Sequence, residues 1–387
     1  MTNILEILKN DKVEWKKLGE VIDYEQPTKY IVTDTNYDNK YDIPVLTAGQ
    51  TFILGYTNEK KGIFKATKEM PVIIFDDFTT SNHWVDFSFK IKSSAMKILK
   101  PKQGLTTFRY CYHYIKTINI DITEHKRMWI SKFSNIEIPI PSLATQEKIV
   151  EILDKFTGYV TELQSELQSR TKQYTYYRDM LLSEEYLNKI TKEMEEDRRV
   201  EIISLGDIGK ISMCKRILKN QTISEGDIPF YKIGTFGKKA DAYISSDLFE
   251  EYKEKYSYPK KGEILLSASG TIGRTIVFNG EDSYYQDSNI VWLSHDEDKI
   301  LNSYLYYCYQ IINWNPATGG TIKRLYNYNL VKLRIVVPPL HIQQHVVSIL
   351  DKFDTLVNDI KQGLPKEIEQ RQQQYEYWRE CLLNFKD

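Results

Sequence analysis

The sequence predicts an α+β protein with two strand-rich globular domains, separated by two long antiparallel coiled-coil helices and related by a pseudo-twofold internal repeat. Two observations predict this fold. One stretch of sequence occurs twice, and each copy ends in a long segment whose apolar residues recur at steps of three and four. The rest of each copy consists of short apolar runs between glycine and polar clusters, a pattern typical of strands.

The repeat is clearest at the pentapeptide Ile-Leu-Asp-Lys-Phe, which occupies residues 152–156 and again residues 349–353, an offset of 197 residues. At the same offset Lys126-Arg127 meets Lys323-Arg324. A single register held from residue 126 to residue 156 is not coincidence, so the two copies are expected to share one fold. The offset is smaller near the start of each copy, as insertions in surface loops permit.

The repeat divides the chain into four parts. We expect a first domain over residues 1–142 with a short helix over 1–12, a first long helix and linker over 143–199, a second domain over 200–339, and a second long helix over 340–387. Within the domains, apolar or alternating runs predict strands at 71–75, 263–266 and 289–293, short helices at 107–115 and 304–312, and closing strands that end in proline at 136–141 and 333–339.

The long helices each carry an apolar seam of the coiled-coil type. The first seam follows Ile149, Leu153, Phe156, Val160, Leu163, Leu167, Arg170, Tyr174, Tyr177 and Leu181. The second follows Val346, Leu350, Phe353, Val357, Ile360, Leu364, Ile368, Arg371, Tyr375, Trp378 and Leu382. The arginine in each seam either extends its stem to the edge of the helix pair or pairs with a carboxylate of the other helix.

The second helix carries a local irregularity that the first lacks. Its seam takes two successive steps of four, from Ile360 to Leu364 and on to Ile368, and Gly363 and Pro365 lie at this point. An internal proline kinks or breaks a helix. We therefore expect a break or bulge at residues 361–365, while the first helix is continuous.

Composition is that of an ordinary soluble protein, with 41% hydrophobic and 27% charged residues and a net charge of −1. No membrane span and no signal peptide are recognisable, so the expected location is the cytoplasm. The four cysteines lie far apart, which favours buried free thiols. Residues 1–142 hold 20 Lys and Arg against 17 Asp and Glu, and residues 201–338 hold 17 against 16. These slightly basic domains are compatible with DNA binding but do not establish it.

Motifs of catalysis are not recognisable in this sequence. It contains no phosphate-binding loop and no zinc-protease motif, and the methyltransferase tetrapeptide is not matched by Asn-Pro-Ala-Thr at residues 315–318. Gly-Thr-Ile-Gly at residues 270–273 favours a tight turn. His341 and His345 have metal-ligand spacing on a helix, but the other copy has Ala144 and Lys148 there, so we expect no metal site. A nuclease with a concealed site is the least favoured alternative.

Two similar but non-identical domains joined by long helices suit the reading of a two-part DNA site. The residues alone also allow a two-headed protein-binding scaffold without a DNA role. Resemblance narrows the choice. Residues 140–149, Ile-Pro-Ser-Leu-Ala-Thr-Gln-Glu-Lys-Ile, and 337–346, Val-Pro-Pro-Leu-His-Ile-Gln-Gln-His-Val, resemble the segment that opens each helix in specificity subunits of type I restriction-modification systems. Residues 262–273 are also typical of that family's target recognition domains. Ser142 departs from the usual second proline, and Gly363 and Pro365 interrupt the second helix.

The resemblance implies a non-catalytic subunit that reads a bipartite, asymmetric site in double-stranded DNA. It also implies recruitment of two methyltransferase subunits and of restriction subunits with motor activity. The cofactors would belong to these partners: S-adenosylmethionine for adenine methylation, and ATP with Mg²⁺ for restriction. No cofactor, metal or membrane is expected for this chain itself.

Base-reading residues are expected among polar and cationic loop residues, because these side chains hydrogen-bond to base edges in the major groove. The basic pair before each closing strand is the best-supported candidate, since both copies carry it, although it could instead contact phosphates. The candidates in the first domain are Gln50, Thr80, Asn82, Lys126 and Arg127, and in the second Lys232, Lys238, Ser269, Arg274, Lys323 and Arg324.

Overall fold

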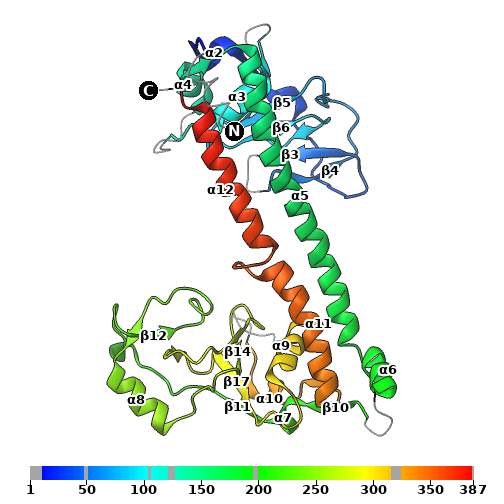
Figure 1. Ribbon diagram of the computed structural model, residues 1–387, viewed down its shortest axis with the longest axis vertical. Coiled ribbons are helices and arrows are strands. Elements are labelled where there is room, and N and C mark those ends of the chain that lie inside the picture. The colour runs from blue at the N-terminus through cyan, green and yellow to red at the C-terminus, as the bar shows by residue number, and fades with distance from the viewer. Residues whose placement is uncertain are drawn as a thin grey trace. The chain divides into compact units, whose positions relative to one another are not determined.

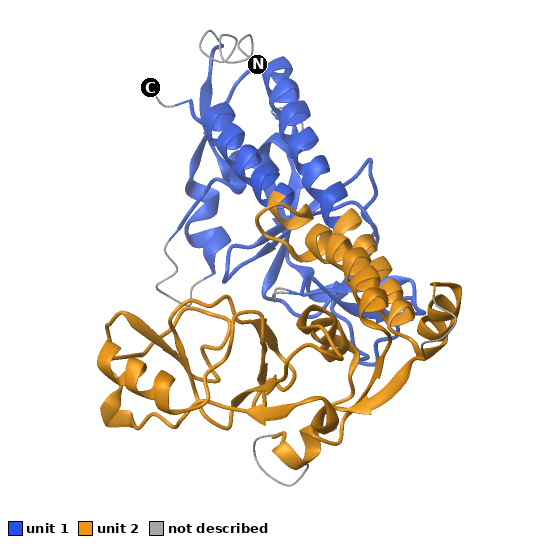
Figure 2. Cartoon of the chain, turned by 60° about the horizontal axis from the view of Figure 1, so that its bottom comes forward, with its two compact units in different colours: residues 1–164, 367–387 blue, residues 165–366 orange. Residues whose placement is uncertain are grey.

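The computed structural model describes residues 11–47, 51–102, 106–120, 127–194, 199–314 and 324–385. The chain forms two compact units (Figure 2). Unit 1 consists of Met1–Gln164 and Glu367–Asp387, and unit 2 of Ser165–Lys366. Each unit therefore combines one strand-rich part with segments of both long helices.

The described residues of unit 1 form three sheets. The four-stranded sheet has the strand order β2 (Ile22–Glu25), β8 (Met96–Pro101), β5 (Val72–Asp76), β6 (Asn82–Val85). The three-stranded sheet has the order β4 (Ile53–Thr57), β3 (Ile43–Leu46), β7 (Lys90–Ile91). The third sheet is the pair of β1 (Glu14–Lys17) with β9 (Glu137–Ile140). Its short helices are α2 (Leu18–Val21), α3 (Phe108–Ile115) and α4 (Met128–Ser131).

Unit 2 repeats this arrangement strand for strand. Its four-stranded sheet has the order β11 (Lys210–Ser212), β17 (Ile290–Ser294), β14 (Ile264–Ser267), β15 (Thr275–Val277). Its three-stranded sheet has the order β13 (Tyr243–Ile244), β12 (Ile228–Tyr231), β16 (Tyr284–Tyr285). Its two-stranded sheet pairs β10 (Glu201–Ser204) with β18 (Arg334–Val337). Its short helices are α7 (Leu205–Ile208), α8 (Ser246–Lys255), α9 (Asn302–Ile311) and α10 (Asn327–Leu330). The internal repeat and the α+β class are confirmed.

The central strand β5 shows why its sequence is an unbroken apolar run. Ile73 and Phe75 pack with Trp129 on one side of the sheet, whereas Val72 and Ile74 pack with Phe89 on the other. A strand covered on both faces needs apolar residues at every position instead of at alternate ones. β14 is buried at every position in the same way.

The long helices are α5 (Leu143–Leu181), α11 (Leu340–Asn358) and α12 (Leu364–Leu383), and a shorter helix α6 (Glu184–Met194) follows α5 (Figure 1). In unit 1 Leu153 of α5 shares a buried cluster with Leu382 of α12. In unit 2 Tyr177 of α5 stacks on Phe353 of α11, with ring centroids 5.5 Å apart. The start of α5 thus packs against the end of α12, and its end against α11, which is an antiparallel pairing in each unit.

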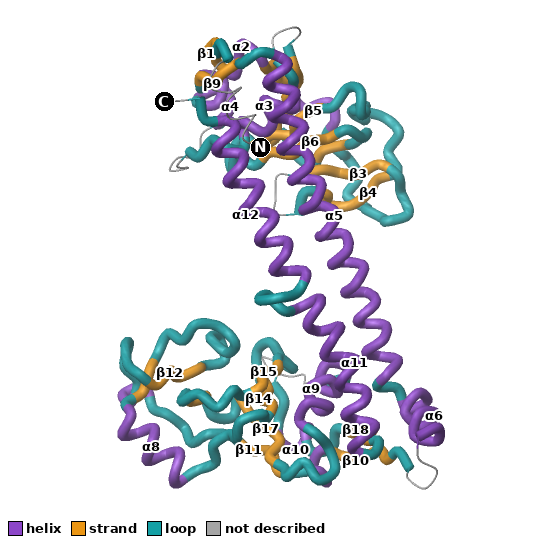
Figure 3. Tube along the Cα trace, in the orientation of Figure 1, coloured by secondary structure: helices purple, strands orange, loops and turns teal. Residues whose placement is uncertain are grey.

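The second long helix is broken, as expected, whereas α5 continues for 39 residues (Figure 3). The break covers residues 359–363, slightly earlier than predicted. A Cβ on Gly363 would lie 2.3 Å from the carbonyl oxygen of Thr355, so only glycine fits there. The seam assignment of Ile360 was wrong: the chain has left the helix at this residue, and Ile360 is 71% exposed.

The two seam arginines do not pair with a carboxylate of the other helix. Arg170 Nε donates to Glu166 Oε1 at 3.2 Å, and Arg371 Nη2 lies 3.5 Å from Glu367 Oε1, in each case within the same helix. Both arginine side chains are more than 40% exposed. Their stems therefore extend to the edge of the seam, which was the other alternative.

The cysteines are free thiols, as expected. Cys111, Cys214 and Cys308 are buried, and Cys381 is half-buried. Burial raises the pKa of each of the three buried thiols to about 12, so they are protonated at neutral pH. Among the described helices, none combines the length and the apolar character needed to cross a membrane. The helix expected over residues 1–12 lies almost wholly outside the described residues, and Asp11 and Lys12 are not helical.

Candidate nucleic-acid interface

The turn after β14 in unit 2 brings together two of the predicted residues. Ser269 Oγ and Arg324 Nη2 both donate to Asn289 Oδ1, each at 2.8 Å. The backbones of Ser269 and Arg324 also form an antiparallel bridge. Residues separated by up to 55 positions in sequence thus form one polar cluster, which we call the Asn289 cluster.

The β14–β15 turn that carries Ser269 is held rigidly. Gly270 and Gly273 have φ values of +66° and +86°, in the left-handed region that favours glycine. A Cβ on Gly273 would lie 2.4 Å from Trp314 Nε1. Ser267 Oγ donates to the carbonyl oxygen of Thr271 at 2.5 Å and accepts from the amide of Arg274 at 2.9 Å. The tight turn expected for residues 270–273 is confirmed.

Other predicted residues of unit 2 have contacts within the protein. Arg274 Nη1 donates to the carbonyl oxygen of Phe236 at 2.8 Å, so this guanidinium connects the β14–β15 turn to the loop after β12. Lys232 Nζ lies 2.8 Å from Asp241 Oδ1 in an exposed ion pair. Lys238, in the same loop, is exposed.

Unit 1 has a matching turn after β5, which shares two backbone hydrogen bonds with the turn after β14. The amide of Met128 donates to the carbonyl oxygen of Asp77 at 2.8 Å, as the amide of Leu325 donates to that of Ala268. The amide of Asp77 donates to Ala95, as that of Ala268 donates to Asn289. Arg127 is therefore the counterpart of Arg324, Phe78 of Ser269, and Ala95 of Asn289.

The chemistry of this position differs between the units. Phe78, which is 37% exposed, and Ala95 have no polar side-chain atom, so neither side chain can bind a guanidinium by hydrogen bonds. Arg127 is exposed, and its side chain has no partner among the described residues. Asp77 is buried instead, facing the buried ammonium of Lys97 at 3.4 Å and accepting from the amide of Trp129 at 2.8 Å.

Thr80 and Asn82 lie in and just after the same turn. Thr80 has a φ of +62°, and its amide donates to the carbonyl oxygen of Asp76 at 2.9 Å. Asn82 Nδ2 donates to the carbonyl oxygen of Thr80 at 3.3 Å, while its buried Oδ1 has no hydrogen-bond partner among the described residues. Three predicted residues, Gln50, Lys126 and Lys323, lie outside the described residues.

Sequence reasoning missed Asn289 and Phe78. Neither residue stands out as cationic, and the offset of the repeat changes in this region, so their positions in the turn were not visible. Strand register supplies the missing signal: Ser267 pairs with Ile290 and Asp76 with Met96, which aligns the two turns residue by residue.

Residues 10–173 and 198–370 each match the protein family described as type I restriction modification DNA specificity domain. Together these two segments cover most of the chain. This protein belongs to the specificity subunits of type I restriction-modification systems. This chain is 47% identical over 398 residues to a type I restriction enzyme specificity subunit of Haemophilus influenzae. The match covers 99% of this chain and 98% of the relative.

A second relative is the specificity subunit of a type I restriction enzyme of Escherichia coli, 41% identical over 409 residues, which cover 100% of this chain and 97% of that one. Among solved structures, the specificity subunit resembles the type I restriction-modification S subunit from M. genitalium with a TM-score of 0.59 at 14% identity, covering 97% of each chain. It also resembles a chain from a structure that concerns complex assembly and conformational transition of the type I system, with a TM-score of 0.50, 16% identity, and coverage of 97% and 98%. These likenesses show the fold.

The glutamine of the repeated helix-opening segment has a structural role in the specificity subunit. Gln146 Nε2 donates to the carbonyl oxygen of Pro141 at 2.8 Å, and Gln343 Nε2 donates to that of Pro338 at 2.8 Å. The Oε1 atoms accept from the amides of Thr107 and Leu301, just before α3 and α9. Both side chains are fully buried. Each glutamine thus joins the closing strand, the long helix and the short helix of its unit.

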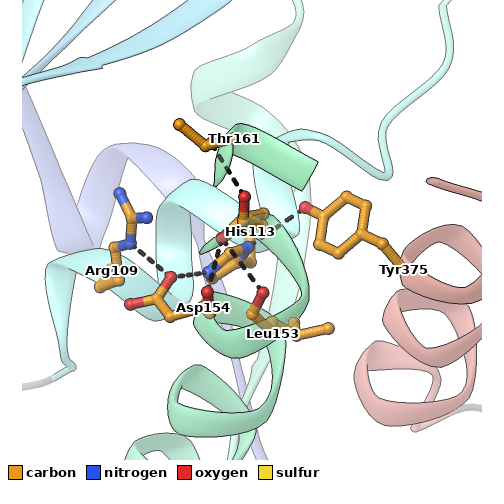
Figure 4. A network of polar contacts seen from close by, with 7 residues as sticks. Arg109, His113, Leu153, Asp154, Thr161 and Tyr375 are labelled. Carbon is orange, nitrogen blue, oxygen red and sulfur yellow. Dashed lines mark hydrogen bonds and ion pairs between the residues drawn. The ribbon is translucent and has the colours of Figure 1, made fainter. Parts of the chain in front are cut away.

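A second repeated contact joins the short helices to the other long helix. In unit 1 the Nε2 atom of the buried His113 lies 2.8 Å from Asp154 Oδ1 on α5, and its Nδ1 lies 3.2 Å from the hydroxyl of Tyr375 on α12 (Figure 4). In unit 2 Gln310 takes the place of His113, and its Oε1 accepts from the hydroxyl of Tyr174 at 3.0 Å. The same connection is therefore made by a titratable residue in one unit and by an amide in the other.

Substituting His113 by the residue of the other unit is expected to reduce the acid sensitivity of the specificity subunit. Burial lowers the pKa of His113 more than the neighbouring Asp154 carboxylate raises it, so the folded chain binds this proton less readily than the unfolded chain does. The unfolded chain binds a proton at about pH 6.5, which favours unfolding as pH falls below that value. Between pH 7.5 and pH 5.5 the Tm of His113→Gln should therefore fall less than the Tm of the wild type. Equal losses, measured by thermal denaturation, would contradict this account.

Proposed function

We propose that the two units read the two different halves of a bipartite, asymmetric DNA site, and that the chain brings methyltransferase and restriction subunits to that site without catalysing either reaction. The methylation cofactor S-adenosylmethionine, and the ATP and Mg²⁺ used in restriction, would be bound by those partners. Catalysis would then depend on where this chain positions them.

One observation carries the proposal. The units repeat the same strand order and share two backbone hydrogen bonds at the turn after the central strand, yet two of the three side chains compared there differ. Phe78, Ala95 and Arg127 in unit 1 correspond to Ser269, Asn289 and Arg324 in unit 2. A constant frame with variable residues at the turn after the central strand is the arrangement expected when two related domains bind different base sequences.

Repeated surface residues support two copies of one partner. Tyr176 and Tyr377 occupy the same repeat position and are 65% and 60% exposed. Each ring packs edge-to-face on the next residue, Tyr177 or Trp378, so each is held in place. Two identical exposed aromatic anchors suit two identical protein partners, because buried tyrosines are frequent energetic centres of interfaces. The methyltransferase subunit is the partner that we assign to them.

The proposal is tested by expressing the chain with its neighbouring open reading frames. A stoichiometric complex with a methyltransferase is expected, and sequencing of the methylome with and without this gene should reveal a modified site in two parts that disappears with the gene. A complex without any methyltransferase, with an unchanged methylome, would favour the two-headed protein-binding scaffold instead.

Removing one exposed tyrosine should remove one partner. Tyr176→Ala and Tyr377→Ala are each expected to leave a complex with a single methyltransferase copy, and the double variant a chain with none, as measured by native mass spectrometry. Tyr159→Ala is the control, because Tyr159 is 50% exposed on α5 but has the half-buried Leu356 at its repeat position. Two copies retained in the double variant would rule out this docking surface.

A further inference from the structure

We infer that Arg324 reads a guanine in the half-site of unit 2, with Asn289 and Ser269 as positioning residues, whereas its counterpart Arg127 in unit 1 contacts a phosphate. This inference rests on the proposed function and assigns the base and the chemistry that one turn would recognise. It follows from the different surroundings of two arginines at the same repeat position.

The backbone of Arg324 is anchored on both sides of its Cα atom. It forms an antiparallel bridge with Ser269, and the amide of the next residue, Leu325, donates to the carbonyl oxygen of Ala268 at 2.8 Å. Leu325 is 2% exposed and packs among Leu266, Val291 and Leu330. The backbone of Arg324, a half-buried residue, is therefore fixed.

The guanidinium itself is also held. Its Nη2 donates to Asn289 Oδ1 at 2.8 Å, and the same oxygen accepts from Ser269 Oγ at 2.8 Å. Asn289 is in turn fixed through its backbone, because its carbonyl oxygen accepts from the amide of Ala268 at 2.7 Å. The acceptor that orients Arg324 thus lies in the turn just before β17, and this hydrogen bond fixes its backbone.

The contact leaves Arg324 suited to a ligand. A guanidinium has five N–H donors, and the Asn289 cluster uses one of them. Among the described residues no carboxylate lies within ion-pair distance of Arg324, so none of them neutralises its charge. Guanine presents two adjacent acceptors, O6 and N7, in the major groove, which match the fork of an arginine. A side chain already ordered loses less conformational entropy on binding, which favours a specific contact.

Arg127 provides the contrast within the same chain. It is exposed, and Phe78 and Ala95 replace the two polar residues that hold Arg324. An unrestrained cation is suited to the phosphate backbone, which tolerates many geometries and carries no sequence information. The two turns share two backbone hydrogen bonds, whereas the side chains beside the arginine differ.

The test is the base preference of the full chain, co-expressed with its neighbouring open reading frames and offered a DNA library with both half-sites randomised. Arg324→Gln is expected to change one position in one half-site from guanine toward adenine, with discrimination for guanine falling roughly 5- to 150-fold. Asn289→Ala, which introduces the residue found in unit 1, should weaken the preference at that same position and leave the others unchanged. Arg127→Ala, the matched control, should lower binding to all sequences alike and reduce the log–log salt slope by about one.

Arg324→Lys keeps the charge but not the fork, so it should retain binding within a few-fold while weakening the guanine preference. This variant decides the question if Arg324→Gln does not fold. Uniform weakening by the Arg324 variants with an unchanged preference profile would assign Arg324 to a phosphate and overturn the inference, with the proposed function intact. A wild-type complex that selects no sequence at all would overturn both.

Discussion

Exchanging the strand-rich part of unit 1 for that of another specificity subunit is expected to change one half of the DNA target completely and to leave the other half unchanged. Residues 13–140 contain the four-stranded and three-stranded sheets of unit 1 and its β1–β9 pair, so the part that we propose to bind DNA is exchanged as one folded piece. Unit 2 has its own sheets and its own turn. Methylome sequencing of cells that carry the exchanged gene reads both half-sites directly.

A narrower exchange makes this experiment sharper. Replacing only residues 22–101 exchanges the four- and three-stranded sheets but keeps β1, α3 and β9. It therefore preserves the contacts of Thr107 with Gln146 and of His113 with Asp154 and Tyr375. Both exchanges should give the same new half-site, and the narrower one should give the more stable protein. A change in both halves of the target would contradict independent reading by the two units.

Inserting four residues after Leu163 in α5 is expected to abolish recognition of the original target or to lengthen the spacer between its halves. α5 is continuous over 39 residues and passes from unit 1 into unit 2. Four residues lengthen a helix by roughly 6 Å, which approaches two base-pair steps at about 3.4 Å each. Binding to a set of DNA duplexes with spacers of increasing length measures the outcome.

The break in the second helix supplies the control. Lys361 and Gln362 are exposed in the segment between α11 and α12, so two residues inserted between them extend a loop and not a helix. We expect this variant to retain the original spacer length. If the loop insertion changes the spacer as much as the α5 insertion does, α5 is not the element that sets it.

Much of this fold was predictable because its signals are local. The seam residues Leu153 and Leu350 recur at helical spacing, and both are fully buried. The run at residues 71–75 predicted a buried strand, and β5 occupies Val72–Asp76. Gly363 and Pro365 predicted the break near which α11 ends. Each of these features depends on neighbouring residues and on backbone chemistry that is the same in any surroundings.

The candidate site was only partly predictable. Ser269 and Arg324 were chosen for their residue types, yet the sequence could not place them on a common oxygen of Asn289. The same holds for His113 and Tyr375, which lie 262 positions apart and meet through their side chains. Ile360 shows the reverse case, since it fits the apolar period but lies outside the helix that the period implied.

The sequence by itself determined the repeat, the long helices, the buried strands and the resemblance to specificity subunits. Periodicity and repeated motifs can be recognised without knowing which distant residues are in contact. Only the tertiary structure decided which residues share a surface. Strand register aligns Phe78 with Ser269 and Ala95 with Asn289 across loops of unequal length. Because hydrogen bonds act over about 3 Å, the chemistry of a turn depends on this register and cannot be deduced from residue types alone.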